Sequence, residues 1–596
     1  MRHSFWSSLS ILYARFNLVN LPLVVILFLT GVSIASPLVP LDQIRLLKPV
    51  VATSTWSGLQ IESPSSATSP ELDSSGKFSV SHLKSGIHHG ISQFATPTWK
   101  LPPRPTSTAS SVPPGVEPED DENPSAAGDW GYLNLVNGSP YNFVVTHNES
   151  ELMTERWKWV TVPPGQGYQS YISLADTSSR GEVFYKIDGT RHSFKLFFDR
   201  KNGFNVTVSL DEGLLGHSKC QTTSLSKHFQ RDRSTNLVIT GTEDLGYWSS
   251  TDLSPDWMQQ LFKVIGGRKL RHICMPGSHD AGVSLLKAKT PFASRENTQT
   301  QISDIYGQLR LGSRYFDIRP VLANGGQFYT GHFGNILGIG NFQGGIGQSM
   351  DDIIENVNRF LSEYNELIIL NLSHSLDAEN GYRVFSQFQW STLFQKLQSL
   401  NHRFNSTRII WPTDDLTSMR LNEFITATEG RVLIIASDAP NALPREGIFP
   451  AVNFPLIDSY ANTPKERQMA SDQIQKLHQA RVITDDNALR KDHFFIFSWT
   501  LTSNFESILK GKSIAHLALD LAYDSIFWRA YNSFTPESFP NVLYMDFFGT
   551  ADWAPAVPGV SQWPSTPPNG TYTDVMLLAM AVNLQIASQN PYVISA

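Results

Sequence analysis

The sequence predicts an α/β fold: a distorted TIM-type (β/α) barrel, preceded by an all-β sandwich-like domain and a disordered N-terminal stalk. Three changes along the chain lead to this prediction. Residues 36–127 are rich in Ser, Thr, Pro and Gly, and short segments rich in β-branched and aromatic residues follow from residue 128. From residue 255 onward, buried strands alternate with amphipathic helices, which is typical of a barrel. A doubly wound open sheet is the alternative, but no GxGxxG turn or phosphate-binding loop favours it.

Composition limits the functions of this protein. With 596 residues the chain exceeds one ordinary core, and 41% hydrophobic residues indicate a globular protein. A net charge of −7 argues against nucleic acid as a partner. The two cysteines, Cys220 and Cys274, provide neither a disulfide framework nor the CxxC spacing of a zinc site. Cys274 lies in a predicted core strand and is expected to pack as a small apolar residue, and no cofactor is expected.

The N-terminus is expected to direct the protein into an export compartment, so that it is secreted or lies at the cell surface. Residues 1–35 contain Arg2 and Arg15 and then an apolar run that ends in Ser33-Ile-Ala35, a small-x-small cleavage pattern. We interpret them as a secretory signal peptide. An uncleaved membrane anchor is the alternative, because the run is about long enough to span a bilayer.

Residues 36–127 are predicted to be a disordered stalk. They hold too few apolar side chains to offset the entropy of ordering the chain. Further along, several Asn-x-Ser/Thr tripeptides are compatible with glycosylation of an exported protein. They begin at Asn137, Asn148, Asn205, Asn405 and Asn569.

Residues 128–215 are predicted to form an antiparallel β-sandwich, and residues 216–254 a linker. Seven short segments are separated by turn signals such as Asn137-Gly138 and Asp188-Gly189, at the spacing of a sandwich. The segments are 130–137, 141–146, 157–162, 169–174, 181–187, 193–198 and 204–208. Their aromatic side chains are expected to pack in the core, and contact with a membrane or glycan is the alternative.

Residues 255–596 are predicted to form the barrel. From Met350 to Tyr364, apolar residues recur every three or four positions, which indicates a helix, and a buried strand is expected at 367–372. The spacing of Thr463-Pro-Lys-Glu466 is that of a capping box and predicts a helix to about Ala480. Further strands are expected at 432–436, 494–498 and 542–547, and one long helix at 513–534.

Charged and titratable groups are expected where two of the strands end. A strand at 273–275 is predicted to break at Pro276-Gly277, and a second strand covers 315–318. The polar side chains at these ends, and after a short aromatic run further on, are Ser278, His279, Asp280, Asp317, Arg319 and His332. Barrel enzymes build their active sites from residues at strand ends. Two histidines and an arginine there indicate acid–base chemistry on a phosphate ester.

Three motifs of this chain, and their order, resemble the catalytic X region of phosphatidylinositol-specific phospholipase C. They are Pro276-Gly-Ser-His-Asp280, Phe316-Asp-Ile-Arg319 and Gly331-His332. The resemblance is greatest to the metal-independent bacterial and fungal branch. It continues through Asp458-Ser-Tyr460 to Leu543-Tyr-Met-Asp-Phe547 and covers most of the C-terminal half. It implies a phosphoric diester hydrolase, of the phosphorus–oxygen lyase type. Its substrate would be a phospholipid or phosphoinositide, reached by transient contact with a membrane surface.

The resemblance also implies a role for each candidate catalytic residue. His279 would remove the proton from the inositol hydroxyl next to the phosphate, and His332 would protonate the leaving diacylglycerol oxygen. Imidazole suits both roles because its pKa lies near working pH. Asp546 would orient His279 and stabilise its imidazolium. Asp280 would do similar work near His332 and Arg319.

Arg319 distinguishes this chain from the animal members of the family. Those members hold calcium with an Asn after the first histidine and with carboxylates at two further strand ends. The corresponding places here are Asp280, Tyr315 and Ser373, so two acidic ligands are missing and no metal is expected. A guanidinium would instead neutralise the charge that develops on phosphorus. Asp317 either supports Arg319 or takes part in the chemistry.

The residues expected to bind the substrate match the family pattern only in part. Asp458 and Tyr460 match residues that, in the bacterial relatives, hydrogen-bond inositol and stack on its ring. The alternative for this pair is structural, an Asp at a helix start beside a core Tyr. Ser373-His-Ser375 stands where a basic residue is expected, and Ala436-Ser-Asp438 stands where an Arg is common. The catalytic groups are therefore expected to be present, while the identity of the substrate headgroup is left undetermined.

Three functions are compatible with these patterns. The first is a phosphodiesterase that cleaves a phosphoinositide, a glycosyl-inositol anchor or a related lipid. The second is a cell-surface binding module that kept the barrel but not turnover, and the third is a phosphodiesterase for a non-inositol headgroup. Intact His279 and His332 favour the enzymes over the binding module. His272, His374 and His493 are expected to be packing or surface groups.

Overall fold

The computed structural model describes the chain from residue 129 onward, with gaps. The described ranges are 129–153, 157–174, 176–200, 205–214, 222–225, 234–250, 253–336, 341–405, 413–439, 442, 446–483, 493–502, 513–549 and 573–594. The predicted signal peptide at 1–35 and the predicted stalk at 36–127 lie outside these residues. Within the described ranges, no helix combines the length and the apolar character needed to cross a bilayer.

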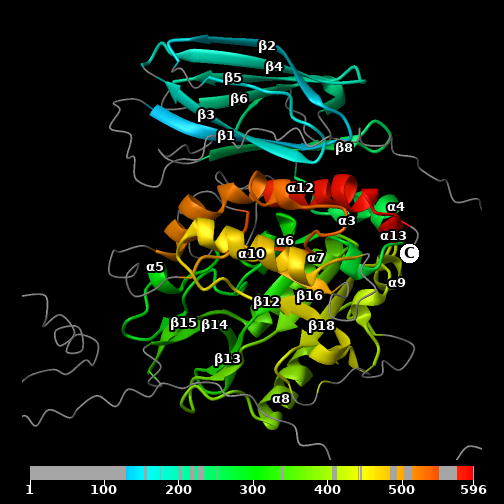
Figure 1. The fold of residues 1–596 in the computed structure, drawn as a ribbon. Helices are drawn as coiled ribbons and strands as arrows, with labels where there is room; N and C mark the ends of the chain where they lie inside the picture. Colours follow the sequence, from blue (N-terminus) through cyan, green and yellow to red (C-terminus); the bar gives the residue numbers. More distant parts are fainter. Residues whose placement is uncertain are drawn as a thin grey trace, which may run out of the picture. The chain divides into compact units, whose positions relative to one another are not determined.

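Residues 129–249 form two β-sheets that share one hydrophobic core (Figure 1). One sheet has the order β3-β1-β8-β9, with β1 and β8 parallel, and the other has the antiparallel order β2-β4-β5-β6-β7. The strands are β1 (Asp129–Gly138), β2 (Phe143–Glu151), β3 (Gln166–Leu174), β4 (Arg180–Ile187), β5 (Ser193–Asp199), β6 (Asn205–Leu210), β7 (Thr222–Ser224), β8 (Ser234–Thr242) and β9 (Gly246–Ser249). Phe143, Tyr185 and Phe194 pack their rings together in this core, as predicted.

The two-sheet structure extends beyond the predicted boundary at residue 215. β8 and β9 lie in the segment 216–254, which the sequence predicts to be a linker, but β8 pairs with β1 along most of its length. The segment 157–162, predicted to be a strand, forms only an isolated bridge between Val162 and Phe143. Pro163 and Pro164 follow it directly and lack the N–H groups that a longer ladder needs.

One of the predicted glycosylation tripeptides is excluded by its surroundings. Asn137 is fully buried, and its Nδ2 donates hydrogen bonds to the carbonyl oxygens of Tyr141 and Val162. A side chain held in this way has no room for a glycan. Asn569 lies outside the described residues.

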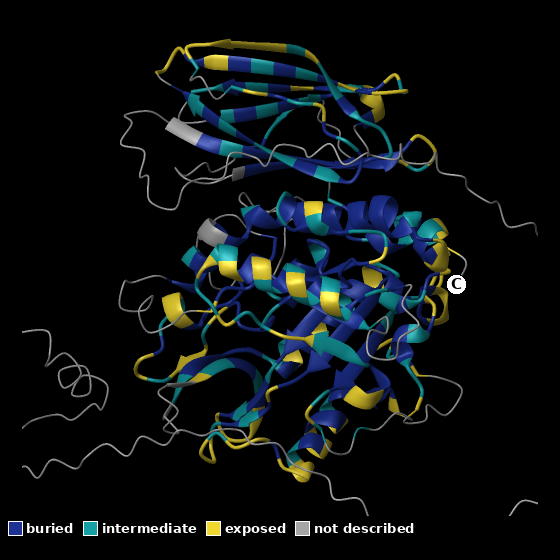
Figure 2. Ribbon diagram, viewed as in Figure 1, coloured by how far each residue is buried: buried dark blue, intermediate teal, exposed yellow. Residues whose placement is uncertain are grey.

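The C-terminal part of the chain is an α/β structure built on a sheet of eight parallel strands (Figure 1). Their order is β19-β18-β16-β12-β10-β22-β21-β20. The strands are β10 (Met275–Ser278), β12 (Tyr315–Ile318), β16 (Leu367–Leu372), β18 (Arg431–Ala436), β19 (Ile448–Pro450), β20 (Leu456–Asp458), β21 (Phe494–Ser498) and β22 (Val542–Met545). Every residue of β12, β16, β21 and β22 is buried (Figure 2), as expected for parallel strands covered on both faces.

The strand order is that of a curled, barrel-type sheet. The first strand, β10, and the last, β22, are neighbours, and the chain steps outward from them one strand at a time in both directions. A doubly wound sheet would place its first strand beside one from the middle of the chain. β19 and β20 are the two edges of the sheet, and the short turn Ala451–Asn453 connects them. The prediction of a barrel-type α/β fold is confirmed at this level, with the sheet open between β19 and β20.

Two of the three predicted helices are present, and one of these begins later than expected. α7 (Met350–Glu363) follows the prediction, and Ser349 caps it by accepting a hydrogen bond from the N–H of Asp352. α10 (Glu466–Ala480) begins after Lys465 and has no side-chain cap. The other described α-helices are α3 (Trp257–Gln260), α4 (Phe262–Ile265), α5 (Arg295–Thr298), α6 (Ile305–Arg310), α8 (Gln387–Leu397), α9 (Leu421–Phe424), α12 (Asp574–Ala581) and α13 (Pro591–Ile594).

The prediction of one long helix at 513–534 is wrong, because this segment is not a single regular α-helix. The segment contains a π-helix at His516–Ala522 and two short 3-10 turns, Asp524–Phe527 and Tyr531–Ser533. Buried side chains occur on several sides of this segment, among them Leu517, Ala522, Tyr523, Ile526, Phe527, Ala530, Tyr531 and Phe534. A single α-helix buries one stripe, so the backbone changes its winding to bury them all.

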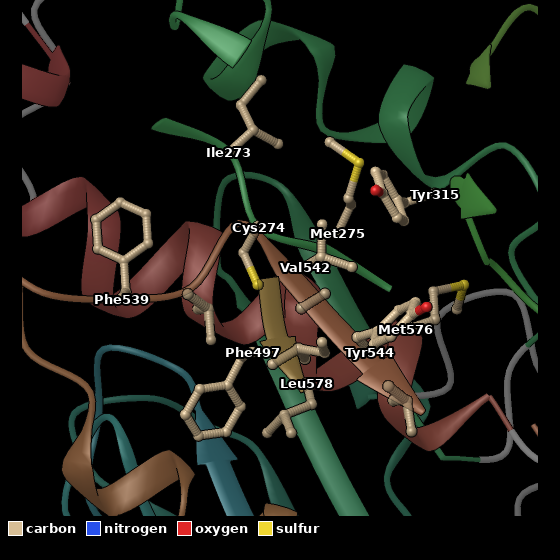
Figure 3. Close-up of a cluster of buried hydrophobic side chains, with 14 of the residues drawn as sticks. Ile273, Cys274, Met275, Tyr315, Phe497, Phe539, Val542, Tyr544, Met576 and Leu578 are labelled. Atoms are coloured by element: carbon tan, nitrogen blue, oxygen red, sulfur yellow. The ribbon is translucent and has the colours of Figure 1, made fainter. Parts of the chain in front are cut away.

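The first barrel strand also differs from the prediction. β10 begins at Met275 and runs through Pro276 and Gly277 instead of ending there. A Cβ atom at Gly277 would lie 2.3 Å from Val542 Cγ1, so glycine allows β22 to approach. Cys274 precedes the strand in the hydrophobic core (Figure 3), where burial raises the pKa of its thiol, and its predicted apolar packing is confirmed.

A smaller sheet is formed by the segments that follow β10, β12 and β16. Its order is β11-β15-β14-β13-β17. The strands are β11 (Ala288–Lys289), β13 (Pro320–Ala323), β14 (Gln327–Ile336), β15 (Asn341–Ser349) and β17 (Leu376–Asp377). Since these segments leave the carboxyl ends of parallel strands, the small sheet stands at the end of the barrel where active sites form.

Candidate active site

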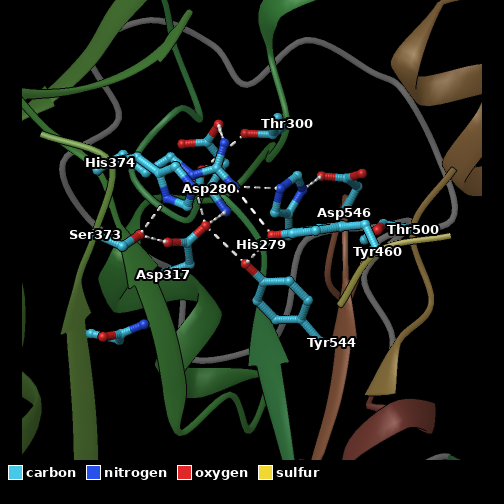
Figure 4. A network of polar contacts seen from close by, with 12 residues as sticks. His279, Asp280, Thr300, Asp317, Ser373, His374, Tyr460, Thr500, Tyr544 and Asp546 are labelled. Carbon is cyan, nitrogen blue, oxygen red and sulfur yellow. Dashed lines mark hydrogen bonds and ion pairs between the residues drawn. The ribbon is translucent and has the colours of Figure 1, made fainter. Parts of the chain in front are cut away.

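Four neighbouring strands of the barrel each end in a polar residue, and these residues form one network (Figure 4). His279 directly follows β10, Arg319 follows β12, Ser373 follows β16 and Asp546 follows β22. The strands are consecutive in the sheet, in the order β16-β12-β10-β22, and all run parallel. Their carboxyl ends therefore meet at one edge, and so do the four side chains.

Three of these strands lead into the same unusual backbone turn. Asp280, His374 and Phe547, each the second residue after its strand, have positive φ angles of 45°, 52° and 51°. This left-handed conformation costs a non-glycine residue about 1–3 kcal/mol, and such residues cluster at functional sites. In each case the turn immediately follows the polar residue at the strand end.

His279 is held between the carboxylate of Asp546 (Figure 4) and the guanidinium of Arg319. Its Nδ1 lies 2.7 Å from Asp546 Oδ1, and its Nε2 lies 2.8 Å from Arg319 Nη2. A guanidinium can only donate, so Nε2 is the acceptor and the ring proton lies on Nδ1, toward Asp546. Gln301 Nε2 donates to the His279 carbonyl oxygen at 2.7 Å, and the N–H of His279 donates to the Met545 carbonyl oxygen at 3.0 Å. Both side chain and backbone of His279 are thus fixed.

The surroundings of His279 shift its pKa in opposite directions. Burial lowers the pKa, Asp546 raises it by charge and by hydrogen bonding, and Arg319 lowers it, so that the pKa lies above its ordinary value. The hydrogen bond that Arg319 donates to Nε2 requires the neutral ring. Protonation of Nε2 would break that bond, so proton uptake at His279 is coupled to release of Arg319.

Arg319 lies between two carboxylates. Its Nε is 2.9 Å from Asp317 Oδ2, and its Nη1 is 3.2 Å from Asp280 Oδ2. The third nitrogen, Nη2, contacts His279 and lies 3.3 Å from the Tyr460 hydroxyl oxygen. A cation bound by the two carboxylates would have to displace this guanidinium, so the donor set favours Arg319 over a metal ion.

Asp317 supports Arg319. Its Oδ2 also accepts a hydrogen bond from the Tyr544 hydroxyl at 2.8 Å, and its Oδ1 accepts from Ser373 Oγ at 2.7 Å. Burial raises the pKa of Asp317, but the charges of Arg319 and His279 and the hydrogen bond from Ser373 together lower it by more, so the carboxyl stays ionised well below its usual range. A carboxylate with so many donors is poorly suited to exchange protons with a substrate. Of the two roles left open by the sequence, this favours support.

Asp458 and Tyr460 stand beside this network, at the end of β20 and just beyond it. The Tyr460 hydroxyl lies 3.3 Å from that of Tyr544, and its ring centroid is 5.6 Å from that of His279. Asp458 has an exposed surface, although many protein atoms surround its carboxyl group. Burial and then the charge of Asp317 raise the pKa of Asp458 to about 6. Because the residue is exposed to solvent, water weakens the effect of both causes on this pKa. Tyr460 is therefore joined to the network by hydrogen bonds, and Asp458 only by its charge.

His332 lies inside β14 of the smaller sheet, not at the end of a barrel strand as expected. The aromatic run does form a strand, but the strand continues past His332 and pairs it with Gly345 of β15. An irregularity between Tyr329 and Gly331 interrupts the ladder just before this position, and such bulges redirect side chains near active sites. His332 Nδ1 is 2.9 Å from the Thr298 carbonyl oxygen. A carbonyl only accepts, so Nδ1 carries a proton and Nε2 can exchange one.

Two hydrogen bonds to backbone carbonyl oxygens connect the surroundings of His332 to the network. The N–H of Gly331 donates to the Arg319 carbonyl oxygen at 3.1 Å, and Thr300 Oγ1 donates to the Asp280 carbonyl oxygen at 2.9 Å. In the described part of the chain, the ring of His332 shares no hydrogen bond with the network itself. Asp280, expected to support both His332 and Arg319, contacts only Arg319 of the two.

Two side chains, those of Ser373 and Tyr544, were not assigned to this network from the sequence. Ser373 Oγ gives its proton to Asp317, so it accepts from His374 Nδ1 at 2.8 Å, which leaves His374 Nε2 available to a ligand. His374 is exposed, as expected of a surface group, but it is linked to the site through this serine. Tyr544 could have been found, because alternate residues of a strand share a face and it stands two residues before Asp546.

Comparisons with known proteins agree with these motifs. No protein-family model matches the chain. A PI-PLC X-box domain-containing protein of Dictyostelium discoideum is 29% identical over 131 residues, which are 20% of this chain and 16% of that protein. A 1-phosphatidylinositol phosphodiesterase of Staphylococcus aureus is 31% identical over 135 residues, which are 22% of this chain and 38% of that protein. The chain thus spans less than half the length of these relatives.

Solved structures of phosphatidylinositol-specific phospholipase C were also found. A variant of the Staphylococcus aureus enzyme has 16% identity and a TM-score of 0.36, covering 56% of this chain and 97% of the other. The Listeria monocytogenes enzyme has 20% identity and a TM-score of 0.30, covering 50% and 94%. Scores of this size do not by themselves establish a common fold. Over about a fifth of its length, this chain is therefore similar to proteins with a PI-PLC X-box domain and to bacterial 1-phosphatidylinositol phosphodiesterases.

Proposed function

We propose that the barrel is a phosphoric diester hydrolase of the phospholipase C type, which cleaves phosphatidylinositol or a related inositol phospholipid without a metal. The observation that carries this proposal is the arrangement of His279 between Asp546 and Arg319. Removal of a hydroxyl proton next to a phosphate needs a base with an unprotonated nitrogen, here Nε2 of His279, and a nearby cation stabilises the charge that develops. The relative named for phosphatidylinositol phosphodiesterase activity supports the same substrate class.

In the proposed reaction, His279 Nε2 takes the proton of the inositol hydroxyl next to the phosphate. The hydroxyl oxygen then bonds to phosphorus while the bond from phosphorus to the diacylglycerol oxygen breaks. His332 gives the proton on its Nε2 to the leaving oxygen, which balances the proton that His279 accepts. The products are a cyclic inositol phosphate and diacylglycerol. Each proton transfer of this kind contributes about 10²–10⁴-fold.

Arg319 has to release His279 before the base can act. Its Nε and Nη1 are anchored by Asp317 and Asp280, so Nη2 is the nitrogen that can change partner. A phosphate oxygen is a charged acceptor and competes well with a neutral imidazole for this donor. Substrate binding would therefore free the base and bring a positive charge to the phosphate in one movement.

A phosphodiesterase for a headgroup other than inositol is a second candidate. Ser373 and Ser437 stand at the ends of β16 and β18, where larger basic residues would reach an inositol ring. Both hydroxyls donate to protein groups instead: Ser373 to Asp317 at 2.7 Å and Ser437 to Asn371 at 2.6 Å. The side of the site that would hold inositol thus has few free donors, which favours a smaller or differently charged headgroup.

The same proposal includes the location of the enzyme. The apolar N-terminal run and the cleavage pattern at residues 33–35 support export from the cell. A phospholipase C works on lipid at the surface of a bilayer, so transient contact with membranes is part of the proposed function.

The test is to incubate the full-length protein with phosphatidylinositol vesicles in the presence of a chelator and to follow cyclic inositol phosphate by phosphorus NMR. We expect release by the wild-type protein, loss in His279→Ala and a large decrease in His332→Ala. Asp415→Asn is the control, because Asp415 pairs with Arg271 before β10 begins, at the opposite end of the barrel. Turnover that disappears on chelation would contradict the role of Arg319.

Parallel incubations separate the remaining functions. Release of a phosphorylated headgroup from phosphatidylcholine or phosphatidylethanolamine vesicles, but not from phosphatidylinositol, would support the second candidate. Vesicle binding without product from any lipid would leave the barrel as a binding module. Activity that is unchanged in His279→Ala would remove this residue from the mechanism.

A further inference from the structure

A histidine and two glutamates meet on β2 and β4, outside the barrel. His147 Nε2 lies 2.8 Å from Glu182 Oε1 and 3.8 Å from Glu149 Oε2. One ligand atom of each residue can be chosen so that all three lie within 4.8 Å of one another. His147 and Glu182 are about one-third exposed, and Glu149 is 77% exposed, so solvent and ions reach the group.

An irregularity in β2 brings the three side chains to one face. Val145 pairs with a core residue of β4, and by simple alternation His147 and Glu149 would also face the core. The register shifts between Val145 and His147, which inserts one extra residue, Thr146, into β2. Beyond this bulge, His147 and Glu149 lie on the outer face together with Glu182. A bulge that turns side chains in this way is typical of a functional position.

Two like charges face each other on this side of the sheet. Glu149 stands directly opposite Glu182 in the ladder, and like charges in this position are destabilising. Two positions further on, Glu151 stands opposite Arg180, and the two form an ion pair. β2 and β4 thus contain the complementary pair Glu151–Arg180 and, next to it, the carboxylates of Glu149 and Glu182, which lie beside the single imidazole of His147.

We propose that His147, Glu149 and Glu182 bind a divalent zinc-type ion on the outer face of this sheet. Zinc bonds of about 2.0–2.1 Å in a tetrahedron place ligand atoms about 3.4 Å apart. The two separations from His147 Nε2 are 2.8 and 3.8 Å, and all three ligand atoms lie within 4.8 Å of one another, so rotation of the exposed Glu149 side chain would bring its carboxylate to the ion. The nitrogen ligand selects zinc over calcium, which takes about 6–8 oxygen ligands. The ion would neutralise both glutamates, and water would complete its coordination.

The ordinary alternative is an ion pair between His147 and Glu182. That pair explains the position of Glu182 but not that of Glu149, whose carboxylate is further away and mostly in solvent. Glu149 is therefore the residue that distinguishes the two interpretations. Its replacement leaves the His147–Glu182 contact in place and removes one ligand of the proposed ion.

The experiment is calorimetric titration of the full-length protein with zinc chloride, together with the absorption spectrum of the cobalt form. We expect one equivalent to be lost, or its affinity to fall by at least about tenfold, in Glu149→Gln and in His147→Ala. Glu149→Lys should mimic the neighbouring pair with Arg180, raising the melting temperature without zinc and abolishing its rise on zinc addition. Calcium chloride should produce no comparable heat.

A second histidine of the same sheets provides the matched control. His192 also contacts two carboxylates, but through different ring nitrogens: Nδ1 to Asp211 at 3.1 Å and Nε2 to Glu243 at 3.2 Å. Its ligands cannot converge on one ion, so His192→Ala should leave the zinc stoichiometry unchanged. Equal zinc binding by wild type and Glu149→Gln, or loss of the site in His192→Ala alone, would overturn the proposal.

Discussion

Replacing Asp546 by asparagine tests the acid–base arrangement most sharply, because it keeps the size of the side chain and removes its charge. In the wild-type protein, Asp546 Oδ1 lies 2.7 Å from His279 Nδ1, and the carboxyl group is almost fully buried. An asparagine amide at this place can donate to Nδ1. The ring proton would then move to Nε2, where it would face Arg319 Nη2, another donor.

The expected effect is large because the base would lose its lone pair. In a Ser-His-Asp triad, the same replacement lowers kcat by about 10⁴-fold through the wrong tautomer. We expect kcat of Asp546→Asn to fall by about 10²–10⁴-fold, which corresponds to about 2.7–5.4 kcal/mol at 25 °C. KM should change little, since Asp546 lies behind the imidazole as seen from the substrate.

The pH dependence of kcat/KM provides a second, independent test of this pairing. His279 must be neutral to act, and its pKa is raised, so kcat/KM of the wild type should decline as pH falls through that raised pKa. In Asp546→Asn, burial and Arg319 are no longer opposed by the carboxylate, so the decline should move to lower pH. The raised pKa also stabilises the fold below the unfolded pKa of about 6.5, and this contribution is lost as pH rises through the folded pKa.

The assay is release of cyclic inositol phosphate from phosphatidylinositol vesicles, measured over a range of pH. Asp415→Asn, which removes a carboxylate from its pair with Arg271 away from the site, should keep wild-type kcat. A kcat of Asp546→Asn within threefold of wild type (about 0.7 kcal/mol), or an acid limb that does not move, would refute the proposed pairing.

Three further predictions concern the neighbours of this pair and the base of the barrel. Arg319→Lys should lower kcat/KM by at least about tenfold, because an ammonium cannot bridge the carboxylates and the phosphate at once, and no metal ion should restore it. Ser373→Ala should raise KM more than it lowers kcat, because it removes a hydrogen bond to Asp317 on the headgroup side; the opposite ratio would contradict this. Glu366→Gln should lower the free energy of unfolding in urea by about 3–5 kcal/mol, because it leaves the charge of Arg314 fully buried without its partner. A loss below about 1 kcal/mol, the range of an exposed pair, would show that this charge is not buried in solution.

The sequence alone determined the features that depend on neighbouring residues. Short apolar runs that stop at polar residues predicted the strands before Arg319 and Asp546, and the regular spacing of apolar residues predicted α7. His279 and Arg319 were identified as site residues because each lies where such a run ends, Arg319 directly after it and His279 after the break at Pro276-Gly277. Local propensity and periodicity are sufficient for this, since they act within one element.

The tertiary structure alone decided which of these residues meet. His279 and Asp546 are 267 positions apart, and they are neighbours only because β10 pairs with β22. The same holds for β8, which joins β1 across a segment that resembles a linker. Strand pairing, register and bulges are selected by the packing of whole sheets, so no local pattern in the chain specifies them.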